Sequence, residues 1–191
     1  MLSTEAAFSA STGAIAGHEW VDLGLSVKWA TCNVGATKPS DYGNYYAWGE
    51  TSTKSDYFAE NCATYGKETD DIAGTSRDVA RVKWGGSWRM PTVAECVELL
   101  NKCTWTWTAQ GGHNGYCVTG PNGNSIFLPA AGFCGESPYL VGLDGFYWSS
   151  TPYEGYYDYD YDAYGLSFAS FSHSLDVFSR FRGFTVRLVT E

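Results

Sequence analysis

Hydrophobic and polar residues alternate over short stretches along most of this chain. The clearest alternation covers 163–170, where Tyr164, Leu166 and Phe168 face one way and Gly165, Ser167 and Ala169 face the other. A period of two predicts a β-strand with one buried face. The same reasoning predicts short strands at 21–25, 27–29, 103–108, 116–119, 125–129, 145–150 and 184–189.

One segment has the period of a helix. Thr92 and Glu95 have the T-x-x-E spacing of a capping box, in which each side chain accepts a hydrogen bond from the other residue's backbone N–H. The spacing predicts a helix over about 93–102, with Cys96 pointing into the core. The apolar residues at i, i+3, i+4 and i+7 are Val93, Cys96, Val97 and Leu100.

The long polar excursion at 34–81 is predicted to contain at most one short helix, near 78–83. The fold class is therefore α+β, with many short antiparallel strands and one or two helices. A length of 191 residues fits one domain, expected at 18–191. Residues 1–17 are small and polar and are predicted to form a flexible arm.

Charge and hydropathy exclude some classes of function. The net charge of −9 disfavours binding to nucleic acid, because an acidic surface repels phosphates. No run of about 18 apolar residues is present, so no membrane insertion is expected. The first 17 residues lack the features of a signal peptide, so any export signal was removed or export uses another route, such as virion assembly.

The cysteine and histidine spacings do not predict a metal site. The six cysteines form no C-x-x-C pair, and the histidines are scattered, so zinc is disfavoured. Buried free thiols are favoured over disulfides, although the sequence leaves both open. The acidic run at 158–162 does not fit an EF-hand, because Ala163 and Ala169 would take the places of the required Gly and Glu. No cofactor is predicted.

Two further readings concern aromatic residues and histidines. Five tryptophans could form a sugar-stacking platform, but core packing is favoured because Trp is usually well buried. No residue is evident that would orient His113 or His173 for catalysis, so His173 is interpreted as a surface residue and no catalytic residue is predicted. The tryptophans are Trp84, Trp88, Trp105, Trp107 and Trp148.

The segment 153–183 has an unusual composition. Tyr, Phe, Ser, Asp, Gly and Ala make up most of it, and it contains no Lys, Asn, Gln, Trp, Met or Cys. Such a composition is typical of recognition surfaces, where aromatic residues give stiff contact area and small polar residues adapt. The expected ligand-binding residues are Tyr156, Tyr157, Asp158, Tyr159, Asp160, Tyr161, Asp162, Ser167, Phe171, Ser172, Ser174, Asp176, Phe178, Ser179, Phe181 and Arg182.

Several stretches, in order along the chain, carry a family resemblance. They are 20–25 (WVDLGL), 29–36 (WATCNVGA), 88–95 (WRMPTVAE), 103–105 (CTW), 115–116 (GY), 119–132 (TGPNGNSIFLPAAG), 147–151 (YWSST) and 186–189 (VRLV). In this order they resemble the C-type-lectin-fold domains common in gut Bacteroidetes and their phages. The R-x-P-T-x-x-E and Y-W-S-S-T motifs are also similar to those of formylglycine-generating enzymes.

One branch of this superfamily consists of variable proteins that retroelements diversify near the C-terminus, as in the phage major tropism determinant. The resemblance implies mutagenesis at adenines, mainly in Asn codons, which cannot yield Lys, Gln, Glu, Trp or Met. The segment 153–183 follows this rule except at Glu154. The implied function is receptor binding by a variable surface, on a tail-associated phage virion protein or at the bacterial surface. The implied ligand is a cell-surface protein or glycan.

The same resemblance leaves alternatives. A non-diversified adhesin or structural surface protein could have this fold, and the tropism proteins are a precedent for homo-oligomers such as trimers. An enzyme of the formylglycine-generating type is the alternative from a different class. It is disfavoured because those enzymes need cysteines in the C-terminal part, and none follows Cys134 here.

Overall fold

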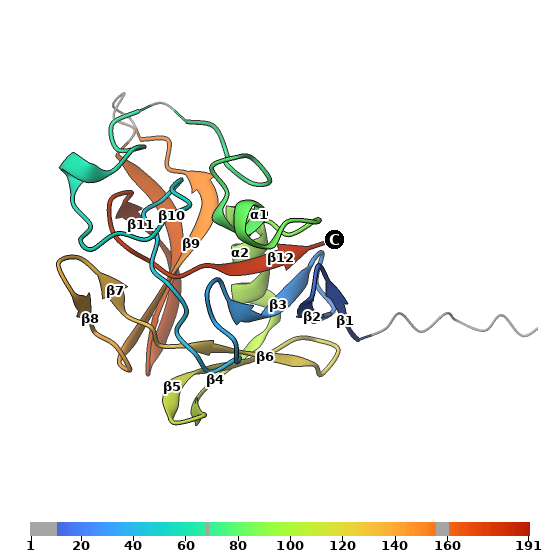
Figure 1. The fold of residues 1–191 in the computed structure, drawn as a ribbon. Coiled ribbons are helices and arrows are strands. Elements are labelled where there is room, and N and C mark those ends of the chain that lie inside the picture. The colour runs from blue at the N-terminus through green and yellow to red at the C-terminus, as the bar shows by residue number, and fades with distance from the viewer. Residues whose placement is uncertain (1–10, 68, 156–160) are drawn as a thin grey trace, which may run out of the picture.

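The computed structural model describes residues 11–67, 69–155 and 161–191 and has an α+β fold made mostly of antiparallel sheets (Figure 1). Within these residues, the strands are β1 (Thr12–Ile15), β2 (His18–Val21), β3 (Lys28–Asn33), β4 (Thr104–Gln110), β5 (His113–Thr119), β6 (Ser125–Pro129), β7 (Phe133–Cys134), β8 (Pro138–Tyr139), β9 (Asp144–Pro152), β10 (Asp162–Ala169), β11 (Ser172–Ser179) and β12 (Arg187–Thr190). The helices are α1 (Val79–Trp84) and α2 (Val93–Lys102), with a short 3-10 turn at Ala59–Asn61.

The described strands form three main sheets and a small hairpin. Their orders are β1-β2-β3-β12, β11-β10-β9, β4-β5-β6 and β7-β8, and every paired neighbour is antiparallel. The C-terminal strand β12 pairs with β3, so the two ends of the fold lie in one sheet (Figure 1). The ordered fold also starts earlier than predicted. Residues 12–15, expected to belong to a flexible arm, form β1 because they pair with β2.

Helix α2 has the predicted bounds and the predicted capping box. Thr92 and Glu95 each accept a hydrogen bond from the other's backbone N–H. Arg89 forms a bidentate ion pair with Glu95, at 2.8 and 2.6 Å, so Arg89, Thr92 and Glu95 interact directly at the start of α2. The expected buried face is wrong at one position: Val97 is 39% exposed, because α2 packs on the sheet through Cys96 and Leu99 instead.

Helix α1 confirms the short helix predicted near 78–83. The buried Asp78 caps it by accepting from the N–H groups of Ala80 and Arg81. The same carboxylate accepts from Gly74 and Met90 N–H groups, so it also ties α1 to the flanking segments. Neither helix in the described part of the chain has the length and apolar character needed to cross a membrane.

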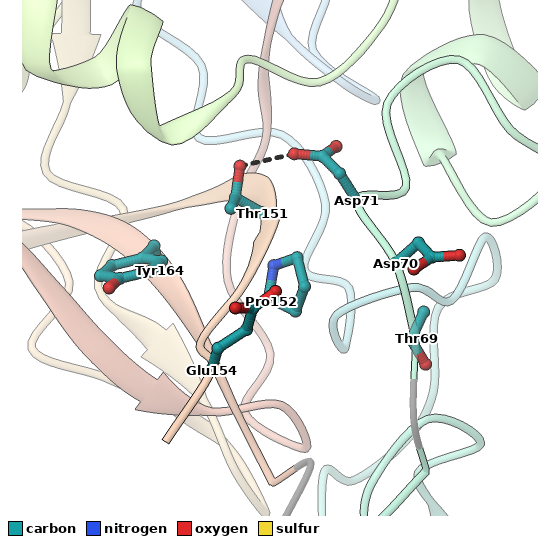
Figure 2. Close-up of a pocket in the computed structure, with 7 residues that line it drawn as sticks. All are labelled: Thr69, Asp70, Asp71, Thr151, Pro152, Glu154 and Tyr164. Carbon is teal, nitrogen blue, oxygen red and sulfur yellow. Dashed lines mark hydrogen bonds between the residues drawn. The ribbon is translucent and has the colours of Figure 1, made fainter. Parts of the chain in front are cut away.

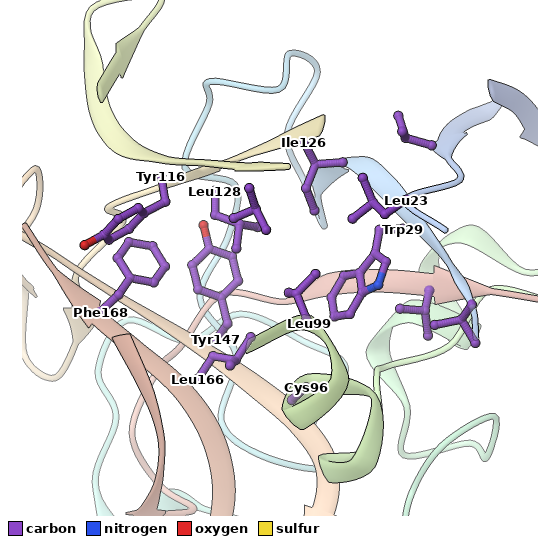
Figure 3. Packing of buried hydrophobic residues seen from close by; sticks show 14 of the residues in the cluster. Leu23, Trp29, Cys96, Leu99, Tyr116, Ile126, Leu128, Tyr147, Leu166 and Phe168 are labelled. Carbon is purple, nitrogen blue, oxygen red and sulfur yellow. The ribbon is translucent and has the colours of Figure 1, made fainter. Parts of the chain in front are cut away.

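The sheet β11-β10-β9 has a hydrophobic cluster on each face. On one face, Tyr147, Leu166 and Phe168 pack toward α2 and the sheet β4-β5-β6 (Figure 3). On the other face, Trp148 and Phe184 stack at 4.3 Å within a second cluster that includes α1 residues. The five tryptophans were predicted to pack in the core. This is confirmed for Trp88 and Trp148, which are buried, while the other three are half-buried: Trp84, Trp105 and Trp107.

A buried polar network joins four strands. The Arg187 guanidinium donates to Asn33 Oδ1 at 2.8 Å, to the Ala30 carbonyl at 3.1 Å and to the Phe127 carbonyl at 2.9 Å. Asn33 Nδ2 donates to the Tyr147 hydroxyl, which donates to the Pro129 carbonyl at 2.6 Å. Because each of these groups is buried and hydrogen-bonded, the network fixes how β3, β6, β9 and β12 lie together.

This network predicts a loss of stability at alkaline pH. Burial raises the pKa of Tyr147 from 10.0 to about 12, so the folded chain keeps this proton when the unfolded chain has lost it. The stabilisation is therefore complete below pH 10 and is lost as the pH rises through about 12, by on the order of 3 kcal/mol. Urea unfolding at a series of pH values measures the loss, and Tyr147→Phe is expected to make it shallower. Equal stability across this range would contradict the prediction.

Candidate ligand-binding face

Strands β10 and β11 form a long hairpin with its outer strand at the edge of the described sheet. In the register, Ser167 lies opposite Ser174 and Phe146, and Gly165 lies opposite Asp176 and Trp148. Residues opposite one another, or two apart in a strand, share a face of a sheet. We define the hairpin face as Phe146, Ser167, Ser174, Asp176 and Phe178.

Three polar side chains form the centre of the hairpin face. Asp176 Oδ2 accepts a hydrogen bond from Ser167 Oγ at 2.5 Å and another from Ser174 Oγ at 2.6 Å. The two hydroxyl oxygens lie 3.1 Å apart. Ser174 and Asp176 are exposed and Ser167 is half-buried, so the group opens to solvent. The prediction that these residues lie at the surface is confirmed for Ser174 and Asp176, while Ser167 is only partly exposed, and ligand binding by all three stays a prediction.

Aromatic rings border this polar centre. Phe178 meets Phe146 edge to face at 5.6 Å, and it lies 3.3 Å from the position of a Cβ at Gly165. A side chain at Gly165 would therefore crowd the Phe178 ring. Phe178 also packs against Phe184 and Trp148, so the prediction that it projects outward as a free aromatic anchor is wrong. The Phe178 side chain is half-buried because the rings of Phe146 and Phe184 pack against it.

The hairpin tip is the most exposed part of the predicted site. Phe171 is 99% exposed, and Ser172 beside it is also exposed. His173 stacks on Trp105 of β4 with ring centroids 4.7 Å apart and planes 7° apart. The tip therefore presents one free aromatic side chain beside a stacked pair.

The base of the hairpin is more covered than predicted. Phe181 packs edge to face on Tyr65, and Tyr161 lies tilted against the same ring. Arg182 lies over the rings of Phe133 and Phe181 at 5.2 and 5.8 Å. Of the predicted site residues here, Tyr161 is exposed, and four are half-buried: Asp162, Ser179, Phe181 and Arg182. Five others lie outside the described residues: Tyr156, Tyr157, Asp158, Tyr159 and Asp160.

Sequence reasoning missed Arg180, which anchors the hairpin base. Its side chain is buried and lies 4.5 Å over the Trp48 ring. The guanidinium donates to the backbone carbonyls of Asp162 at 3.0 Å and Lys67 at 2.8 Å. Arg180 lies between Ser179 and Phe181, and this setting carries no signal of burial, since arginine is mostly exposed.

A polar pocket of about 630 Å³ lies beside the hairpin (Figure 2). Residues from the 69–71 segment, the end of β9 and β10 line it, including Asp70, Asp71, Glu154 and Tyr164. Asp71 Oδ2 accepts from the Thr151 hydroxyl at 2.6 Å. The carboxylates favour cations, but in the described parts of the chain no group of three or more His, Cys, Asp or Glu side chains could hold a metal ion.

Comparisons of the chain with protein-family models, with curated proteins and with solved structures gave no match.

The thiols and histidines have environments that limit their chemistry. All six cysteines are free thiols in the structure. Burial raises the pKa of Cys96, and it raises the pKa of Cys103 to about 11, which reduces the thiolate available at neutral pH. His113 stacks on Tyr42, with Nδ1 2.6 Å from the Ser40 carbonyl.

Proposed function

We propose that this chain is a receptor-binding protein with a C-type-lectin-like fold, whose ligand contacts are made by the hairpin face and the hairpin tip. The proposal includes diversification of these positions by a retroelement. The ligand is a protein or glycan on a bacterial cell, and the chain acts from a phage virion or from a bacterial surface.

One observation carries the proposal: the buried side chains of the hairpin lie in β10, while β11, at the edge of the sheet, presents mostly exposed side chains. In β10, Leu166 and Phe168 are buried while Ser167 between them reaches the surface. In β11, five of the eight side chains are exposed, among them Ser172, Ser174 and Asp176, and none is fully buried. Since exposed positions tolerate substitution within about 0.5 kcal/mol, such a surface can change while the core keeps the fold.

The residue types at these exposed positions agree with the proposed mutagenesis. Ser, Phe, His and Asp can all arise from Asn codons by changes at adenines, and these types occupy 171–174 and 176. The landmarks of the family resemblance support the fold part of the proposal, because Trp29, Trp88 and Trp148 within them are core residues.

Comparison of several clones of the same locus tests this function. We expect substitutions at Ser167, Phe171, Ser174 and Asp176, together with a nearby template repeat that differs at adenines and a reverse transcriptase gene. Buried positions of the same hairpin serve as the internal control and are expected to stay constant: Ala163, Leu166, Phe168 and Arg180. Substitutions spread evenly over buried and exposed positions would contradict the proposal.

A further inference from the structure

The polar centre of the hairpin face presents hydrogen-bond acceptors to solvent and has its donors in use. Ser167 and Ser174 each have one hydroxyl hydrogen, and each hydroxyl lies within hydrogen-bond distance of Asp176 Oδ2. When both hydrogens point to this carboxylate, the two hydroxyls keep only lone pairs for a ligand. Asp176 Oδ1 accepts no hydrogen bond from any residue in the described part of the chain, so it adds a further acceptor.

The surroundings of this centre favour positive charge. Asp176 is an exposed carboxylate, and Phe178 follows it on the same face about 7 Å along the strand. The partly exposed edge of an aromatic pair adds apolar contact for the stem of a long side chain. The net charge of −9 attracts basic partners over longer distances.

From this arrangement we infer that the hairpin face binds an arginine or lysine side chain of a protein partner. The inference rests on the proposed function and specifies its ligand class. A guanidinium offers five N–H donors and no acceptor, so it matches a surface that offers acceptors. A neutral sugar hydroxyl fits less well, because it has a single O–H donor and no charge to pair with the carboxylate.

The test uses the full chain, labelled with nitrogen-15, and two small probes followed by nuclear magnetic resonance. N-acetyl-arginine methylamide carries the guanidinium, and N-acetyl-citrulline methylamide has nearly the same shape without the charge. The arginine probe is expected to shift the amide signals of Gly165, Ser174 and Asp176 and to bind about two- to fivefold more tightly than the citrulline probe.

Two matched variants locate the effect. Asp176→Asn keeps the shape of the side chain but removes the charge and adds a donor, so we expect it to abolish the preference for the arginine probe. Glu19→Gln makes the same change of charge on the exposed surface of β2, in a different sheet, and is expected to keep the preference. A thermal melt of Asp176→Asn confirms that it folds.

Several results would overturn the inference. They are equal binding of both probes, an unchanged preference in Asp176→Asn, or shifts centred on the acidic pocket around Asp70 and Asp71. Stronger shifts of the hairpin face by a methyl glycoside would assign the site to a glycan instead. If the arginine probe shows no preference but clones vary at the hairpin face, the inference fails and the proposed function stands. If the arginine probe is preferred but the clones are invariant, the chain is a fixed adhesin for basic partners and the proposed diversification fails.

Discussion

Replacing Arg187 with methionine is expected to lower the free energy of unfolding by about 3 kcal/mol. The guanidinium is fully buried and donates to three oxygens, those of Asn33, Ala30 and Phe127. Methionine fills much of the same space but has no donor, so all three oxygens are left without this partner. An unpaired buried acceptor costs about 1–3 kcal/mol.

The expected loss is smaller than three such costs because the substitution also removes a buried charge. Burial lowers the pKa of Arg187, because removing the charged guanidinium from water costs free energy. No carboxylate among the described residues pairs with this guanidinium. Its hydrogen bonds to the three carbonyl oxygens therefore offset the cost of burying the charge. The lost hydrogen bonds join β12 to β3 and β6, so the substitution affects the whole frame rather than one loop.

Urea denaturation of the wild-type chain and two variants measures this effect. Arg77→Met is the matched control, because Arg77 is exposed and should change the free energy of unfolding by less than about 0.5 kcal/mol. If Arg187→Met proved as stable as Arg77→Met, the buried network would not be what holds the sheets together.

The parts of the fold that follow local rules were predictable from sequence. Helix α2 was predicted with its bounds because Thr92 and Glu95 act within one turn, where sequence spacing fixes geometry. Which face of α2 is buried depended on packing with distant strands, and so Val97 was assigned wrongly. Strand β1 was missed because small residues show little alternation, and only its pairing with β2 orders it.

Strand β11 was not predicted as a strand, although its surface residues were. Leu175 packs toward the α2 side of the sheet while Phe178 packs toward the other side, so the strand lacks a single apolar face. Its polar residues Ser174 and Asp176 were correctly expected at the surface, since their residue types are mostly exposed. Composition does not reveal which phenylalanines are exposed. Phe171 projects into solvent, whereas Phe178 and Phe181 pack on other aromatic rings.

Replacing Arg180 with alanine is expected to loosen the hairpin base and to cost about 3 kcal/mol of stability. The side chain bonds to backbone carbonyls at Asp162, Thr64 and Lys67, so it ties the start of β10 to the 64–67 segment. Its stacking over Trp48 adds packing that alanine removes. Opening at this base would disturb the hairpin face while leaving the pairing of β3 with β12 in place.

Amide hydrogen exchange distinguishes local opening from general destabilisation. The backbone N–H groups of Trp48 and residue 180, which bond to the Arg180 and Tyr161 carbonyls, are expected to exchange faster in Arg180→Ala, whereas those of β3 and β12 keep more of their protection. Arg182→Ala is the matched control two residues away. Arg182 is half-buried and its guanidinium lies over the rings of Phe133 and Phe181, so the loss of its side chain should cost less than about 1 kcal/mol. Equal effects of the two substitutions would show that Arg180 does not anchor the hairpin.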